Sequence, residues 1–211
     1  MRVRPNREQI AAAYFDVFAH GAAGPATMRE VARSTMTSYG SIYHAFASKE
    51  DLARTVDAGL ATWTARELSF LAKPGDPVAM LQSWFAGSEV FALGLAFWIS
   101  DRVRQAIKRG NDDDLEDSRG VLEGVCSAVA TATGLSVGRS RALLVELQSL
   151  ALSRFLLGLG VPTVASREKE WRAILDGPEP APETNGTDAY DLEVTAIDGW
   201  ELIRSGRHPD D

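Results

Sequence analysis

The sequence predicts an all-α protein with a small N-terminal head and a larger helical body. Apolar residues recur every three or four positions through most of the chain, the period of a helix that buries one face. Runs that alternate between apolar and polar residues, as half-buried strands do, are scarce before residue 190. Glycine, proline and helix-capping residues separate the periodic stretches at intervals typical of helices.

The head is expected to contain three helices. The first runs from about Arg7 to His20 and ends at the glycine- and proline-containing segment 21–25. Thr27 to Glu30 has the residues of a capping box, in which each side chain bonds the other residue's backbone N–H, so a short second helix begins there. Ser38 is a suitable N-cap for a third helix, about Tyr39 to Ala45.

The body begins with a fourth helix, about Lys49 to Ala72, that Ser48 caps. After a break at residues 73–77, further helices are expected over Pro77 to about Phe91, about Ala92 to Arg109, the acidic cluster at 112–114 to about Thr133, Ser136 to about Leu159, and about Thr163 to Leu175. These patterns divide the chain into a helix-turn-helix domain at 1–47, a helical domain at 48–177 and an acidic, partly disordered tail at 178–211. Within the tail, residues 188–204 fit a short helix or a strand equally well.

The distribution of charge favours a head that approaches nucleic acid. The net charge is −7, but residues 1–56 carry seven basic and five acidic residues, and the remainder carries the whole negative excess. A mildly basic head can approach phosphates, whereas phosphates would repel the acidic body.

We expect a cytoplasmic protein that neither associates with a membrane nor holds a cofactor or a metal. The basic N-terminus has no apolar segment after it, and no unbroken apolar stretch reaches the ~18 residues of a membrane span. The single cysteine, Cys126, excludes an intrachain disulfide and falls on an apolar helical face, which is typical of a core residue. His20, His44 and His208 do not have the spacing of metal ligands.

The two short helices of the head carry the residues that point to a function. They are expected to pack on the first helix through Phe18, Val31, Ile42 and Phe46. This packing leaves a face of small, hydroxyl-bearing and aromatic residues exposed, namely Tyr39, Gly40, Ser41, Tyr43 and His44. Such a face suits a DNA major groove, because small residues allow close approach and hydroxyls bond phosphates or base edges.

The same segment resembles the DNA-binding domain of the TetR (tetracycline repressor) family of bacterial regulators. The matching positions are Ile10, Ala13, Phe18, Thr27, Val31, Ala32, Ser38, Gly40, Ser41, Ile42, Tyr43, Phe46, Ser48, Lys49, Glu50 and Leu52. The resemblance covers about residues 7–54, and the rest is similar to the family only in its helical pattern and length. The turn departs from the family pattern, because Met36 and Thr37 stand where a glycine and an apolar residue are usual. A positive φ at Met36 would cost on the order of 1 kcal/mol.

The resemblance implies a set of DNA contacts: Thr27, Ser38, Tyr39, Gly40, Ser41, Tyr43, His44 and Lys49. Tyr43 and Lys49 are expected to hold the DNA backbone, and Tyr39, Gly40 and Ser41 to lie near the bases. Lys49 begins a helix, where its charge and the backbone N–H groups together favour a phosphate. Arg2, Arg4 and Arg7 are candidates for additional phosphate or minor-groove contacts.

Two groups of apolar residues in the body are candidates for an effector pocket and for a dimer interface. The first, Met80, Trp84, Phe85, Phe91, Phe97 and Trp98, is either ordinary core or the pocket of a small hydrophobic effector, which the resemblance favours. The second lies on the leucine-rich helix from Ser136, whose leucines occur on more than one face. We expect Leu147, Leu150 and Phe155 to form a homodimer interface there.

Together these expectations describe a ligand-responsive repressor, not an enzyme, that binds a palindromic operator as a homodimer. Effector binding would move the fourth helix and change the separation of the two heads. The alternative is a helical enzyme or a small-molecule-binding protein that retains the head. It would use the titratable groups of the body, Asp101, Arg102, Arg104 and Glu123, which have no known catalytic spacing. A third interpretation is a protein-interaction module that uses the acidic tail.

Overall fold

The computed structural model describes residues 5–20, 26–110, 112–157 and 167–177, and the regular structure in these ranges is entirely helical. The all-α prediction is therefore confirmed. The elements are α1 (Arg7–His20), α2 (Met28–Ser34), α3 (Tyr39–Ala45), α4 (Lys49–Leu68), the 3₁₀ helix η1 (Ser69–Ala72), α5 (Pro77–Arg109), α6 (Asp112–Thr133), α7 (Val137–Leu157) and α8 (Glu168–Asp176).

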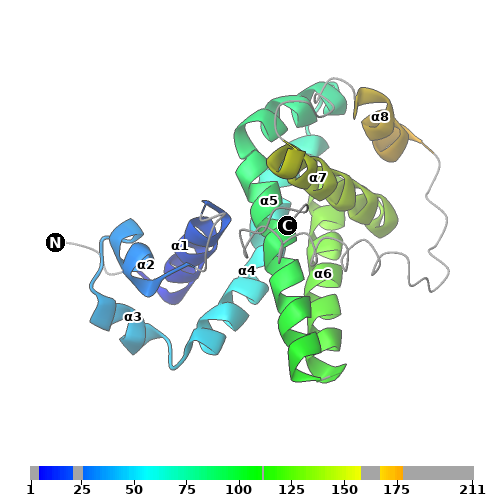
Figure 1. Ribbon diagram of the computed structural model, residues 1–211. Coiled ribbons are helices and arrows are strands. Elements are labelled where there is room, and N and C mark those ends of the chain that lie inside the picture. Colours follow the sequence, from blue (N-terminus) through cyan, green and yellow to red (C-terminus); the bar gives the residue numbers. More distant parts are fainter. Residues whose placement is uncertain (1–4, 21–25, 111, 158–166, 178–211) are drawn as a thin grey trace.

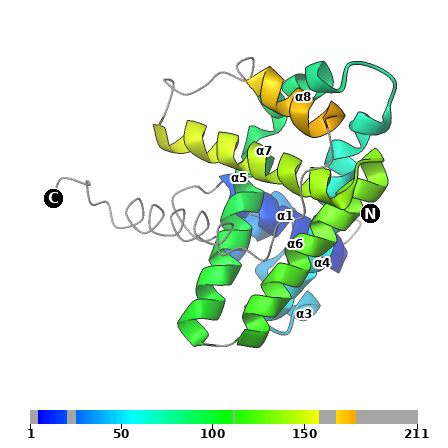
Figure 2. The ribbon, with the colours of Figure 1, turned by 90° about the vertical axis from the view of Figure 1, so that its right-hand side faces the viewer.

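The head and the body lie side by side and share α4. Helices α1 to α3 form the head, and α4 runs from the head into the body (Figure 1). In the body, α5 and α6 are antiparallel neighbours, α7 crosses both, and α8 contacts α5 and α7 (Figure 2). Helix α1 contacts both α4 and α5, so the head rests on the body along two helices.

Local capping fixes the helix starts of the head as the sequence predicts. The Thr27 N–H donates to the Glu30 carboxylate at 2.9 Å, and the Glu30 N–H donates to the Thr27 hydroxyl at 3.3 Å. The hydroxyls of Ser38 and Ser48 accept the N–H groups of the residues three positions later, both at 3.1 Å, and so begin α3 and α4. Each cap satisfies a backbone donor that the helix leaves unpaired.

The head buries most of the apolar residues that the sequence assigns to it. Val31, Ile42 and Phe46 are nearly inaccessible and lie in one core. Phe18 is partly buried against the same core, and its ring lies 5.2 Å from that of Trp98 on α5. Phe18 therefore belongs to the contact between head and body.

The body departs from the predicted boundaries in two places. The fourth helix ends at Leu68, and its last predicted turn tightens into η1. The two helices predicted between Pro77 and Arg109 are one element, with a kink at Ser88 (φ −124°, ψ 17°) instead of a break after Phe91. Helix α7 is described from Val137 to Leu157 and α8 from Glu168. The predicted separator at 160–162 and the tail at 178–211 lie outside the described residues.

The expectation that no segment is long and apolar enough to cross a membrane is wrong for α5. By length and composition α5 passes that test, and α6 with α7 would pass it only as one span bent by 108°. Core helices of soluble proteins pass the same test. In this fold α5 contacts α1, α6, α7 and α8 and buries Phe85 and Leu95 completely or nearly so, which is the environment of a core helix.

Candidate DNA-binding site

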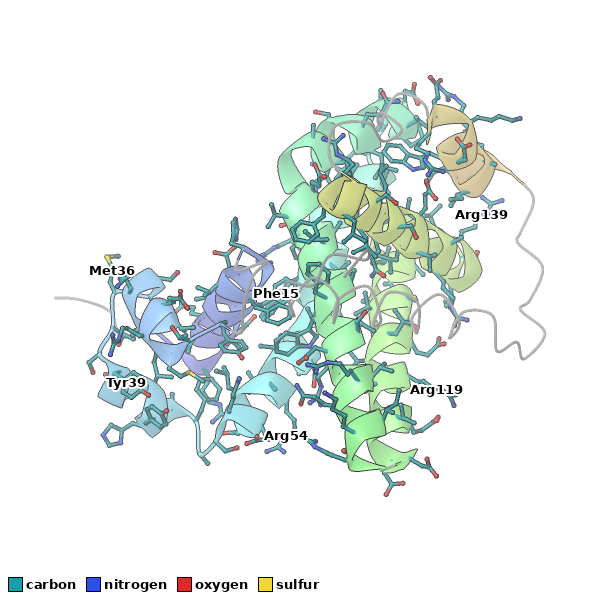
Figure 3. The ribbon with its side chains drawn as sticks, in the orientation of Figure 1. Phe15, Met36, Tyr39, Arg54, Arg119 and Arg139 are labelled. Carbon is teal, nitrogen blue, oxygen red and sulfur yellow. The ribbon has the colours of Figure 1, made fainter. Side chains whose placement is uncertain are left out.

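Helix α3 presents its polar and aromatic face at the outer end of the head. Tyr39 and Tyr43 are about half exposed, Gly40 and His44 are exposed, and Ser41 is half-buried. Ile42, on the opposite face, is buried in the core, and so orients the helix. Figure 3 shows Tyr39 on the side of the head that faces away from the body. The five residues predicted to face outward are therefore together on one accessible surface.

Tyr39 and Tyr43 form a pair on this surface. They lie one helical turn apart, with ring centroids 4.8 Å apart and hydroxyl oxygens 3.0 Å apart. The hydrogen bond to Tyr39 raises the pKa of Tyr43, so the Tyr43 phenol stays neutral at physiological pH. One hydroxyl donates to the other, which leaves the pair one O–H to donate to a phosphate or a base edge.

Three predicted contacts near α3 differ in whether their polar groups already form hydrogen bonds: Lys49, Thr27 and Ser38. Lys49 is the first residue of α4 and is exposed, as a phosphate contact requires. The Thr27 hydroxyl donates to Glu30 at 2.7 Å, which lowers the pKa of that carboxyl. The hydroxyls of Ser38 and Ser41 lie 2.8 Å apart. Thr27 and Ser38 thus act as helix caps. A hydroxyl of either residue that contacts DNA must keep its capping hydrogen bond at the same time.

Arg7 has a structural position that the sequence did not indicate. Its guanidinium donates to the Asp51 carboxylate at 2.8 Å and to the Ala45 carbonyl, and it lies 4.4 Å from the centroid of the Phe46 ring. The bond from Arg7 lowers the pKa of Asp51. Arg7 therefore joins the start of α1 to the end of α3 and the start of α4. No sequence pattern links positions 38 to 44 residues apart, and Arg2 and Arg4 lie outside the described residues.

The turn between α2 and α3 has a positive φ at Met36, the position where the family pattern usually has glycine. Met36 adopts φ +50°, and its side chain is 80% exposed. The Thr35 hydroxyl donates to the Val31 carbonyl at 2.8 Å, and the Thr37 N–H donates to the Ala32 carbonyl at 2.9 Å. The turn thus keeps a left-handed residue between the helices although that residue is not glycine.

Two short helices, a tight turn and an exposed polar face on the second helix have the geometry of a helix-turn-helix. Residues 10–56 match the family model described as bacterial regulatory proteins, tetR family. This head is a TetR-family DNA-binding domain. The chain is accordingly a DNA-binding transcriptional regulator. Comparison with curated proteins and with solved structures gives no match.

In the body of this regulator the predicted aromatic cluster does not form one pocket. Its members pack against different partners along this long helix, which is kinked at Ser88. Phe85 packs on Trp171 of α8, Phe97 packs on Phe155 of α7, and Trp98 packs on α1. Met80 is half-buried near the start of the helix.

Trp84 and Phe91 alone among these six line a cavity. It measures about 10 Å³, room for about one water molecule, and is lined by Thr64, Leu68, Trp84, Phe91, Ala92, Leu95, Leu144, Leu147 and Gln148. The Thr64 hydroxyl and the Gln148 amide nitrogen are buried in its wall without a hydrogen-bond partner. Neither of these polar residues was singled out by sequence reasoning.

The predicted dimer residues are only partly available for an interface. Leu147 and Leu150 point into the core of their own subunit and are 2% and 0% exposed, so assigning them to a dimer interface is wrong. Phe155 is 37% exposed, and its ring lies 5.5 Å from that of Phe97. The exposed apolar residues of α7 that the sequence did not single out are Val137, Val145 and Leu156.

The titratable groups of the enzyme alternative are engaged in separate ion pairs. Asp101 pairs with Arg104, Arg102 with Asp57 at 3.0 Å, and Glu123 with Arg141. Cys126 is fully buried, as expected for a core residue, and burial raises the pKa of its thiol. In the described ranges no three His, Cys, Asp or Glu side chains are placed to hold a metal ion.

Proposed function

We propose that this TetR-family regulator is a ligand-responsive repressor that binds a palindromic operator as a homodimer. The observation that carries the proposal is the exposed α3 face beside an exposed Lys49, where α2, α3 and α4 each begin at a side-chain cap. Tyr43 and Lys49 hold the DNA backbone, and Tyr39, Gly40 and Ser41 lie at the base edges of the major groove. His44, Thr27 and Ser38 border this contact.

The surface of α7 supports dimerisation. Val145, Leu152 and Leu156 are seven and four residues apart, so they share one stripe of the helix, and Ser149 leaves space between them. Val145 and Leu156 are 46% and 44% exposed. Two copies that bury this stripe about a two-fold axis present two heads to one operator, with half-sites about 34–36 Å apart in a standard helix-turn-helix dimer.

The cavity supports a response to a small hydrophobic molecule. Phe91 lines the cavity, and its ring also lies 5.6 Å from Phe15 of α1. A ligand larger than the present cavity displaces Phe91 and so disturbs the packing of α1 on the body. The ligand binds the arrangement with Phe91 displaced more tightly than the original one. The ratio of these two ligand affinities limits how far operator affinity can fall. The Thr64 and Gln148 groups would offer such a ligand hydrogen bonds within an apolar wall.

Selection from a pool of random duplex DNA tests the proposal. The full-length protein should enrich an approximately palindromic site with two half-sites. On that site, Lys49→Ala should weaken binding to all sequences similarly and reduce the slope of log affinity against log salt by ~1. Tyr39→Phe and Ser41→Ala should instead change which bases are preferred.

Lys73→Ala is the matched control, because Lys73 is an exposed lysine between η1 and α5, outside the head. It should leave affinity and salt slope unchanged. Enrichment of no sequence, or equal salt slopes for the parent and Lys49→Ala, would count against the proposed DNA contacts.

A further inference from the structure

The head meets the body most closely where α1 crosses α5 at Gly94. A Cβ placed on Gly94 would overlap the Cβ of Ala19 and lie 3.1 Å from its Cα. Only glycine at this position lets the two backbones come so near. The register of α1 along α5 is therefore fixed at this crossing.

Trp98 follows Gly94 by one turn and fills the space beside the crossing. Its ring lies 5.9 Å from that of Tyr14, 6.2 Å from Phe15 and 5.2 Å from Phe18, all in edge-to-face arrangements. The side chain is 5% exposed. One residue of the body thus contacts three aromatic rings of the first helix of the head, and edge-to-face packing restricts their orientation.

The indole of Trp98 is also tied to α4. Its N–H donates to one Asp57 carboxylate oxygen at 2.7 Å, and the other oxygen pairs with Arg102 at 3.0 Å. The side chains of Asp57 and Arg102 are 10% and 24% exposed, so water competes little for these bonds. Trp98 and Arg102 are one turn apart on α5, and together they hold a single carboxylate of the helix that leads out of the head.

We propose that Trp98, held by Asp57 and Arg102, is the positioning residue that sets the orientation of the head on the body. Trp98 contacts α1, the first helix of the head, through its ring. It contacts α4, the helix that runs from the head into the body, through its N–H. An apolar contact has little directional preference, whereas a hydrogen bond to a buried carboxylate specifies a direction. The inference rests on the proposed function, because in a dimer the orientation of each head determines which half-site spacing both heads can reach together.

The test measures affinity for the selected operator and for versions lengthened or shortened by one base pair, about 3.4 Å, between the half-sites. The parent should discriminate between these spacings. Trp98→Phe keeps an aromatic ring but removes the N–H, and it should reduce this discrimination about tenfold, while affinity for an isolated half-site stays the same. A purely structural role would lower affinity for every operator by the same factor.

Glu67→Gln is the matched control. Glu67 also lies on α4, and its carboxylate accepts the indole N–H of Trp84 on α5 at 3.2 Å, but that ring packs on Phe70 and Phe85 and not on α1. This variant should keep the spacing preference of the parent. If Trp98→Phe fails to fold, Asp57→Asn, which removes the charge that pairs with Arg102, decides the question by the same measurement.

Unchanged discrimination in a folded Trp98→Phe or Asp57→Asn variant overturns the inference, as does an equal loss in Glu67→Gln. A parent that discriminates shows that both heads bind together, so these results leave the proposed function standing. A parent that binds no two-half-site DNA contradicts the proposed function itself.

Discussion

Met36 adopts a backbone conformation that glycine adopts more readily. Its φ of +50° brings Cβ close to the following carbonyl, at a cost of about 1–2 kcal/mol for an L-residue. The side chain is 80% exposed, so burial does not offset this cost. The hydrogen bonds on either side, from Thr35 to Val31 and from Thr37 to Ala32, hold the turn in place.

Met36→Gly should therefore stabilise the folded protein. The relief of strain exceeds the greater unfolded-state entropy of glycine, and we expect a gain of up to about 1 kcal/mol in the free energy of unfolding. Chemical denaturation monitored by circular dichroism measures it. Met36→Ala is the control, since it removes the side chain but keeps Cβ. Equal stability of the glycine and alanine variants would show that the turn is unstrained.

Asp57 makes the stability of the junction depend on pH. Burial raises the pKa of this carboxyl despite the Trp98 N–H and Arg102, which favour its charged form, and Asp117 adds to the rise. A carboxyl with a raised pKa binds its proton more tightly in the folded state. Its contribution to stability is therefore complete below the unfolded pKa of about 3.9 and is lost as the pH rises through the folded value.

Asp57→Asn cannot lose a proton, so its stability relative to the parent should improve as the pH rises from about 4 to 7. Melting temperatures of both proteins across this range measure the difference. Parallel pH profiles, or a relative loss of stability in the variant with rising pH, would contradict the raised pKa.

At the scale of elements, the aromatic residues of α5 contact three neighbouring helices and line the cavity. Its Trp98 contacts α1, Phe97 contacts Phe155 on α7, Phe85 contacts Trp171 on α8, and Trp84 lines the cavity. The kink at Ser88 separates the half near α8 from the half near the head. A molecule bound in the cavity therefore contacts one of the two tryptophans of α5 and not the other.

A hydrophobic compound that binds the cavity should change the fluorescence of Trp84. The parent and Trp98→Phe should both respond in a compound screen, whereas Trp84→Phe should lose the response because the other tryptophans within the described ranges, Trp63, Trp98 and Trp171, do not line the cavity. Binding should also raise the melting temperature by mass action. A response that persists in Trp84→Phe would place the ligand elsewhere, and a screen with neither response nor thermal shift would leave the cavity as a packing defect of the core.

At the scale of the whole molecule, the faces of α7 have opposite roles. Leu147 and Leu150 complete the core of the subunit, while Val145 and Leu156 face solvent. A charge on the outer face opposes dimerisation without disturbing the fold, whereas a charge at Leu147 has no room and no partner inside.

We expect Val145→Asp combined with Leu156→Asp to give folded monomers with much weaker operator binding. Leu147→Asp, the contrasting change on the same helix, should instead unfold the protein. Sedimentation of each variant at micromolar concentration, with circular dichroism for folding, distinguishes these outcomes. A parent that sediments as a monomer, or an outer-face variant that stays dimeric, would disprove this interface.

The sequence alone determined the helical class, the head and its helix starts, because these depend on residues close together in the chain. The Thr27–Glu30 capping box, the Ser38 and Ser48 caps and the period of Val31, Ile42 and Phe46 act within one or two turns. The TetR-family pattern is similarly local, so the exposed face of α3 could be predicted residue by residue. The positive φ at Met36 could be suspected because the turn length is fixed by the two helices that flank it.

Only the tertiary structure decided which face of each long helix meets which neighbour. Periodicity places Leu147 and Val145 on different faces of α7, but it does not say which face the subunit covers itself. For the same reason it could not separate the aromatic residues of α5 into three contacts and a cavity wall. The bonds of Arg7 to Asp51 and of Trp98 to Asp57 join residues 44 and 41 positions apart, and they arise from helix packing that no local pattern records.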